Sequence, residues 1–188
     1  MDLKKSVLLL FCGAFHCTLP CLPDCKCEGD KIKCDNGQYK DLPRPVDSVT
    51  SLTMVNNSFT QLDMLDITQW NALNMLNLTD NNILTVIKSS EDVSPHQSLV
   101  SLDLSRNSLQ VLHIRVFSDF PCLEYLNLSR NHLHTLSDGT SLPVLKHLHL
   151  EYNHLQEIPS LLLASSAHLH LIQLSHNRIS RLTGNNLN

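Results

Sequence analysis

The stretch SLVSLDLSRNSLQVL, residues 98–112, places five leucines around one asparagine, Asn107. The leucines follow one another at intervals of three, two, five and three residues, which match neither a pure strand nor a pure helix. The short piece Leu102-Asp103-Leu104 alternates apolar and polar side chains as a β-strand does. We therefore expect a short strand here, followed by a turn at Asn107.

The same pattern occurs six times along the chain. Aligned on the asparagine, the copies cover 49–62, 73–86, 99–112, 123–136, 145–158 and 169–182, and the asparagines lie 24, 26, 24, 22 and 24 residues apart. A leucine-rich composition alone does not keep such a register, so the chain is built of repeats. The repeated asparagines are Asn57, Asn81, Asn107, Asn131, Asn153 and Asn177.

One repeat cannot bury its own leucines, but stacked repeats can. The predicted fold class is an α/β solenoid shaped like a horseshoe, with a parallel β-sheet on the concave face and a leucine core behind it. The return segments are only about ten to twelve residues long, which leaves room for short 3₁₀ or extended pieces on the convex side but not for full helices. Residues 89–98, SSEDVSPHQS, lengthen one return segment, and we expect them to bulge on the convex or flanking side.

The repeated asparagine has a structural explanation. A chain that turns toward the core carries backbone N–H and C=O groups away from water, and these groups need partners. An asparagine carboxamide both donates and accepts hydrogen bonds. We expect the six asparagines to form a ladder that ties each turn to the next.

Residues 1–18 predict a secretory signal peptide, and hence a secreted, extracellular protein. The basic start MDLKK precedes the apolar run SVLLLFCGAF, which is too short to span a bilayer and remain there. We place the cleavage point near Thr18; the alternative is a buried N-terminal helix. No later segment of the sequence is long and apolar enough to cross a membrane.

The cysteines also indicate an oxidising environment. Four of the seven, Cys21, Cys25, Cys27 and Cys34, lie within 14 residues. In a secreted chain such a group indicates two disulfides, and the alternative, a zinc site of four thiolates, fits an oxidising route poorly. Cys122 stands alone, and we expect either a half-buried thiol or an interchain disulfide that joins a dimer.

The pattern LxxLxLxxNxLxxL at about 24-residue spacing resembles the extracellular leucine-rich-repeat proteins, and C-x3-C-x-C-x6-C from Cys21 to Cys34 looks like their N-terminal cysteine cap. Small leucine-rich proteoglycans, receptor ectodomains and circulating immune proteins carry similar caps. The resemblance implies a cap over 19–47, six repeats over 48–188, and the disulfides Cys21–Cys27 and Cys25–Cys34. Such proteins often end in a second cysteine cap, but no cysteine follows Cys122. We therefore expect that something covers this end, or that the chain is a truncated part of a larger membrane receptor ectodomain.

The architecture presents a concave surface for recognition and no reaction centre. Gly-rich phosphate loops, G-x-S-x-G and H-E-x-x-H are absent from the sequence, and we expect no catalytic residues, no metal and no cofactor. With 14 Lys and Arg against 18 Asp and Glu, the sequence has no basic footprint for nucleic acid. The expected partner is an extracellular or cell-surface protein, in an immune, signalling or matrix role. The residues predicted to bind it on the concave face are Tyr125, His147, His149, Tyr152, Met75, Asp103, His170 and Gln173.

Histidines are unevenly distributed along the chain and leave alternatives open. Eight of the eleven lie between residues 132 and 176, and His147, His149 and Glu151 share one strand face. This grouping allows a metal-binding or enzymatic role for the last repeats, or a binding face whose imidazoles charge together below about pH 6.5. Ordinary polar surface is the third interpretation.

Three asparagines, Asn56, Asn77 and Asn127, begin sequons for N-glycosylation. The sequence LNLS is also what the repeat requires for structural reasons, so occupancy does not follow from the motif. We place Asn77 and Asn127 in the central row of the concave face. Glycans there would shield the first four repeats and shift ligand contact toward the histidine-rich end.

Overall fold

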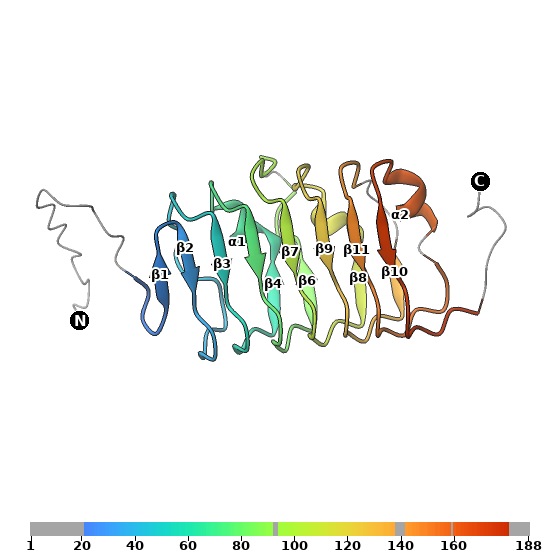
Figure 1. Ribbon diagram of the computed structural model, residues 1–188, viewed down its shortest axis with the longest axis horizontal. Coiled ribbons are helices and arrows are strands. Elements are labelled where there is room, and N and C mark those ends of the chain that lie inside the picture. The colour runs from blue at the N-terminus through green and yellow to red at the C-terminus, as the bar shows by residue number, and fades with distance from the viewer. Residues whose placement is uncertain (1–20, 92–93, 138–141, 159, 181–188) are drawn as a thin grey trace, which may run out of the picture.

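The computed structural model describes residues 21–91, 94–137, 142–158 and 160–180. The predicted signal peptide, residues 1–18, lies outside the described residues. The chain winds into successive coils that lie side by side in one curved solenoid (Figure 1). Within the described residues, no helix combines the length and the apolar character that crossing a membrane requires.

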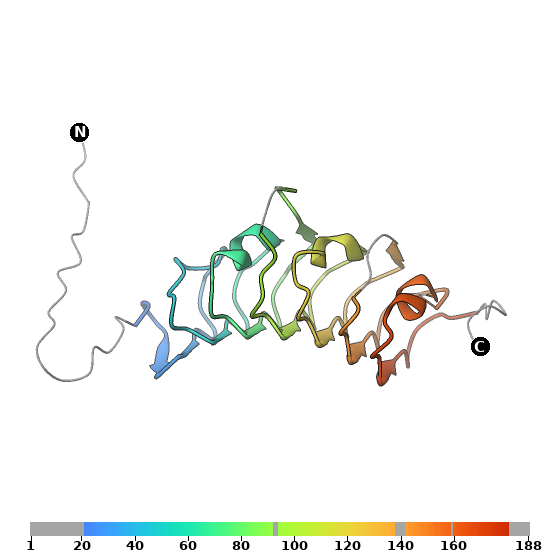
Figure 2. The same cartoon turned by 90° about the horizontal axis from the view of Figure 1, so that it is seen from above.

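One eight-stranded sheet runs along the whole solenoid and lines its concave side (Figure 2). β1 (Lys26–Glu28) and β2 (Lys31–Lys33) form an antiparallel hairpin, and every later neighbour pairs in parallel. The predicted parallel sheet is thus confirmed. The six strands that the repeats contribute are, in spatial order, β3 (Ser51–Thr53), β5 (Met75–Asn77), β7 (Ser101–Asp103), β9 (Tyr125–Asn127), β11 (His147–His149) and β12 (Leu171–Gln173).

Short elements cover the convex side, as the length of the return segments predicts. β4 (Gln61–Asp63) pairs with β6 (Thr85–Ile87), and β8 (Val111–His113) pairs with β10 (Thr135–Ser137). η1 (Ile114–Phe117) is the expected 3₁₀ turn. α1 (Met64–Thr68) and α2 (Ser160–Ser165) are short α-helices, where we expected 3₁₀ or extended chain. The side chain of Asp63 caps α1 by accepting a hydrogen bond from Leu65 N, which favours an α-helical start.

The core lies between the two sides of each coil. In the concave sheet, the middle residue of each of the strands β3, β5, β7, β9 and β11 is a leucine that points inward and is fully buried. Aromatic side chains of the return segments close the core from behind, with Trp70, Phe117 and Phe120 each no more than 1% exposed. Burying one such side chain contributes about 1.5–3 kcal/mol, so the stacked core is the main stabilising term.

The repeated asparagines form a continuous ladder inside the solenoid. Asn131 is only 3% exposed. Its Nδ2 donates to Leu104 O of the preceding coil at 3.0 Å and to Leu128 O of its own coil at 3.1 Å, and its Oδ1 accepts from Leu109 N at 3.1 Å. The equivalent contacts recur at every rung from Asn57 to Asn177, so each turn is joined to the one before it.

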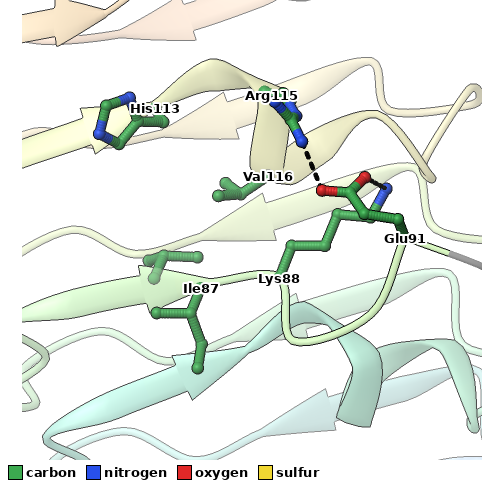
Figure 3. A pocket seen from close by; sticks show the side chains of 7 residues that line it. Ile87, Lys88, Glu91, His113, Arg115 and Val116 are labelled. Carbon is green, nitrogen blue, oxygen red and sulfur yellow. Dashed lines mark hydrogen bonds and ion pairs between the residues drawn. The ribbon is translucent and has the colours of Figure 1, made fainter.

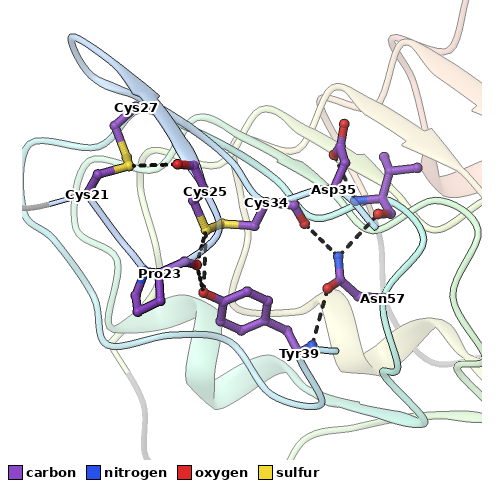
Figure 4. The surroundings of a disulfide bond; sticks show 9 residues. Cys21, Pro23, Cys25, Cys27, Cys34, Asp35, Tyr39 and Asn57 are labelled. Carbon is purple, nitrogen blue, oxygen red and sulfur yellow. Dashed lines mark hydrogen bonds between the residues drawn. A yellow bond between two sulfur atoms is a disulfide. The ribbon is translucent and has the colours of Figure 1, made fainter. Parts of the chain in front are cut away.

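The N-terminal cysteines form the cap (Figure 4). Disulfides join Cys21 to Cys27 and Cys25 to Cys34, the pairing that the resemblance implies. Asn57, the first rung of the ladder, donates to Cys34 O at 2.7 Å and accepts from Tyr39 N at 3.2 Å. The cap is therefore joined to the repeats by the same carboxamide contact that joins the repeats to one another.

The lengthened return segment lies on the convex side, in agreement with the expected bulge (Figure 2). Residues 92 and 93 lie outside the described residues. His96 anchors the segment, because its buried ring contacts Trp70 O through Nε2 at 2.8 Å and accepts from Leu99 N at 3.1 Å. On the other side of the bulge, Lys88 pairs with Asp119 at 2.9 Å.

The ladder predicts a large stability loss for Asn131→Ala. This variant leaves Leu104 O, Leu128 O and Leu109 N buried without their present partner. Because each such group costs about 1–3 kcal/mol, we expect the free energy of unfolding to fall by at least about 2 kcal/mol in urea titrations under non-reducing conditions. Asn82→Ala, at an exposed asparagine, serves as the control and should stay within about 0.5 kcal/mol of the wild type. Equal stability of the two variants would contradict the structural role of the ladder.

Candidate functional site

The concave face consists of three rows of side chains that run across the six repeats. Strand pairing aligns the first and the last residue of each strand, and a third set follows two residues later. The first row is Ser51, Met75, Ser101, Tyr125, His147 and Leu171. The second row is Thr53, Asn77, Asp103, Asn127, His149 and Gln173. The third row is Val55, Thr79, Ser105, Ser129, Glu151 and Ser175.

An aromatic and imidazole cluster lies where β9 meets β11. The ring of Tyr125 lies 5.1 Å from the ring of His149 and 6.2 Å from that of His147, measured between centroids. His149 Nδ1 contacts Gln173 Oε1 on β12 at 3.1 Å. Leu126 and Leu148 are fully buried beneath these strands, so the cluster stands on a packed base.

Two carboxylates flank Tyr125. Asp103 lies on β7, where its Oδ2 accepts from Asn127 Nδ2 at 3.1 Å. Glu151 follows β11, with its Oε1 3.8 Å from His149 Nδ1. Burial raises the pKa of the Tyr125 phenol, and the negative charges of Asp103 and Glu151 raise that pKa further. The electrostatic environment of the ring is therefore acidic.

The structure brings together five of the eight side chains predicted to bind a partner: Tyr125, His147, His149, Gln173 and Asp103. Met75 lies two strands from Tyr125, on β5, and is 46% exposed. His170 is exposed just before β12. Tyr152 lies at one edge of the concave face, where its ring stacks on His176 at 4.1 Å.

Tyr152 belongs to an edge row that our sequence analysis missed. The residue before each ladder asparagine adopts a left-handed backbone, with φ between 53° and 57°. Side chains of neighbouring coils pair along this row: Arg106 contacts Asp80 at 3.7 Å, and the Arg130 guanidinium lies 4.2 Å from the centre of the Tyr152 ring. The edge row could have been found in the sequence, because its residues all stand directly before a repeated asparagine. The row consists of Asn56, Asp80, Arg106, Arg130, Tyr152 and His176.

Comparison with known proteins matches this geometry to one family. The family model described as "Leucine rich repeat" matches residues 97–155. Tsukushi of Gallus gallus is 34% identical over 140 residues, which cover 67% of this chain and 37% of Tsukushi. The chain is a leucine-rich-repeat protein.

Further relatives and solved structures agree with this assignment. The NT-3 growth factor receptor of Pan troglodytes is 29% identical to this leucine-rich-repeat protein over 142 residues, which cover 72% of the chain and 15% of the receptor. The crystal structure of a TLR13–ssRNA13 complex aligns with a TM-score of 0.67 at 29% identity, over 78% of this chain and 21% of the TLR13 chain. This leucine-rich-repeat protein thus spans well under half the length of each of these relatives.

The histidine-rich end has no metal-binding geometry within the described residues. No group of three or more His, Cys, Asp or Glu side chains in that part of the chain is arranged to hold a metal ion. His147 and His149 face Tyr125, and the second histidine also contacts Gln173. Their rings therefore extend the aromatic surface of this leucine-rich-repeat protein around Tyr125, at interplanar angles of 47° and 44° to the Tyr125 ring.

A second histidine cluster lies away from the sheet, at the turns that follow the ladder. The His154 ring lies 5.7 Å from His132 and 5.2 Å from His134. Desolvation lowers the pKa of His154, and the charge of Arg178 and the proximity of His134 and His132 lower it further. Protonation of His154 is thus less favourable in the folded chain than in the unfolded chain.

A hollow on the convex side of the leucine-rich-repeat protein contains a network of ion pairs (Figure 3). Val86, Ile87 and Val116 contribute apolar lining to a space of about 360 Å³. Glu91, which also lines this space, forms ion pairs with two cations, Lys88 at 3.4 Å and Arg115 at 2.5 Å. Because each cation is already paired, this network ties the bulge to η1 and offers no free charge to a ligand.

Cys122 is half-buried in the turn before β9 and forms no disulfide within the described residues. It lines a shallow groove on the flank of the leucine-rich-repeat protein with Val100, Glu124 and Val144. This environment agrees with the half-buried thiol that the sequence suggested. A dimer joined through Cys122 stays a prediction.

The lowered pKa of His154 predicts acid sensitivity. The unfolded chain binds a proton at this position more readily than the folded chain, so the free energy of unfolding falls as the pH drops through the histidine range from about 6.5 downward. We expect His154→Gln to lose less stability than the wild type between pH 7.5 and pH 5, as measured by urea midpoints. His168→Gln, at an exposed histidine in a different turn, should retain the wild-type dependence. The same acid response in all three proteins would contradict the role assigned to His154.

The three sequons differ in accessibility. Asn56 is exposed on the edge row, whereas Asn77 and Asn127 are half-buried on the concave face. The Nδ2 atoms of Asn56 and Asn127 both donate in the folded chain, to Asn36 Oδ1 at 2.7 Å and to Asp103 Oδ2 at 3.1 Å, so the two sites differ in exposure and not in hydrogen bonding. We expect mass spectrometry of protein made in mammalian cells to find higher occupancy at Asn56 than at Asn127, and Asn56→Gln to remove most of the glycan mass. Predominant occupancy at Asn127 would contradict this order.

Proposed function

We propose that this chain is a secreted leucine-rich-repeat protein that recognises an extracellular or cell-surface protein through its concave face. In this proposal, residues 1–18 export the chain. Tyr125, His147, His149 and Tyr152 act as the main anchors. The supporting contacts come from Met75, Asp103, His170 and Gln173.

The observation that carries the proposal is the first row of the concave face. Met75 and Leu171 are 46% and 38% exposed there, on either side of Tyr125 and His147. Exposed apolar and aromatic side chains on a rigid surface are typical of protein interfaces, where a few anchors supply most of the binding energy. The ladder beneath holds these strands in register, so little conformational freedom is lost on binding.

The relatives support a recognition role. The NT-3 growth factor receptor is by name a receptor for a protein, and its similarity extends over 72% of this chain. The aligned TLR13 structure contains single-stranded RNA. The mildly acidic composition of this chain, and the acidic surroundings of Tyr125, disfavour a phosphate backbone as ligand.

Truncation of the anchors tests the proposal. The chain is used to capture binders from a displayed collection of extracellular proteins, and the affinity of each binder is then measured by surface plasmon resonance. We expect Tyr125→Ala combined with His147→Ala to weaken binding at least tenfold, because both side chains are lost from the centre of the contact.

Val111→Ala is the matched control, since Val111 is 51% exposed on β8 of the convex side. It should bind as the wild type does. If the concave and convex variants lose affinity for the captured binders equally, recognition through this face is contradicted. The same holds if no captured binder depends on Tyr125 and His147.

A further inference from the structure

The concave face carries an unusual distribution of charge. Of the eighteen side chains in its three rows, only Asp103 and Glu151 are charged at neutral pH with histidine uncharged, and none is a lysine or an arginine. The nearest lysines of the sheet, Lys31 and Lys33, lie on β2, three strands from Asp103. The centre of the face is therefore negative.

Among the residues that the structure describes, no permanent cation pairs with either carboxylate. Asp103 accepts from two neutral donors, Ser105 N at 2.9 Å and Asn127 Nδ2 at 3.1 Å. The one ion-pair contact of Glu151 is with the titratable His149, at 3.8 Å, and its Oε2 is buried with no hydrogen-bond partner within the described residues. The Glu151 side chain as a whole is 19% exposed, so its charge is weakly compensated within the face and is reachable from solvent, although the Oε2 atom itself is buried.

The charge of Asp103 is not required by the fold. In the repeats on either side, Asn77 and Asn127 occupy the same register position. Their Oδ1 atoms accept from the backbone N–H two residues later at 2.9 Å and 3.0 Å, as Asp103 Oδ1 does at 2.9 Å. An asparagine can thus make the structural contact, and the negative charge at position 103 remains available to a partner.

Other cations near the face already have partners. Arg106 is paired with Asp80, and Arg130 lies over the ring of Tyr152. Both belong to the edge row and stand outside the three rows of the face. Tyr125 lies on β9, between β7, which carries Asp103, and β11, which Glu151 follows. An aromatic ring attracts a cation in addition to the carboxylates.

We propose that Asp103, Tyr125 and Glu151 form the binding site for a basic segment of the protein partner, which presents Arg or Lys side chains to the two carboxylates across the ring of Tyr125. The proposal rests on the proposed function and specifies its partner by charge. Asp103 lies on β7 and Glu151 follows β11, two positions away in the sheet and on the order of 10 Å at the backbone, so the site fits two basic side chains of one segment. A guanidinium meets a carboxylate by paired hydrogen bonds and an aromatic ring by stacking.

Two short peptides test the proposal on the full chain at pH 7.4. One is Gly-Ser-Arg-Ser-Arg-Ser-Gly, acetylated and amidated, and the other carries citrulline at both arginine positions. Binding is followed by NMR through the imidazole signals of His147 and His149. We expect saturable shifts with the arginine peptide and at least tenfold weaker binding of the citrulline peptide, whose side chains have the same shape without the charge.

Asp103→Asn combined with Glu151→Gln should weaken binding of the arginine peptide at least tenfold. Asp66→Asn combined with Glu157→Gln is the matched control, because it changes the net charge equally at exposed acids outside the concave rows. Equal binding of both peptides, an undiminished affinity of the first variant, or an equal loss in the control would each overturn the proposal. If Tyr125→Ala with His147→Ala still abolishes capture of a protein partner in that case, recognition through the concave face stands and only the basic chemistry of the partner is wrong.

Discussion

The asparagine ladder is the interaction on which the structure depends. Each coil turns inward and carries backbone groups away from water, and one carboxamide serves groups from two coils. Asn107, for example, accepts from Ile83 N and donates to Leu78 O and Leu104 O, each at 3.0 Å. Because the contact fixes the offset between neighbouring coils, the strands align in register. The concave rows, and any surface built from them, follow from that alignment.

Much of the fold could be predicted because two periodicities of the sequence constrain it. The spacing of the asparagines sets the coil, and the alternation within each strand decides which side chains face outward. The convex side was predicted only in outline. Return segments share no common spacing, so local contacts decide their form, such as the Asp63 cap that begins α1 and the Lys88–Asp119 pair beside the bulge. Neither contact follows from a repeat pattern.

The rows of side chains that form the candidate site could be predicted from the sequence, but the contacts between individual side chains could not. Register placed Tyr125 next to His147 on the neighbouring strand, and a sequence reading could group them. Side-chain orientation decided the rest: Tyr125 lies closer to His149, and Asp103 turns toward Asn127. The sequence analysis assigned Tyr152 to the concave face with them, but its left-handed backbone places it in the edge row instead.

The polar side chains of the ladder are paired in the interior of the solenoid, whereas some acidic groups on the concave face are not. Inside the solenoid, every ladder carboxamide donates and accepts, although such contacts serve only the fold. On the face, Glu151 keeps an unpaired oxygen, and Asp103 carries a charge where its neighbours use an amide. Stability alone favours the paired arrangement, since an unsatisfied buried group is costly. A scaffold held by its ladder and leucine core can tolerate that cost, and the unpaired acids are then already in position when a complementary charge arrives.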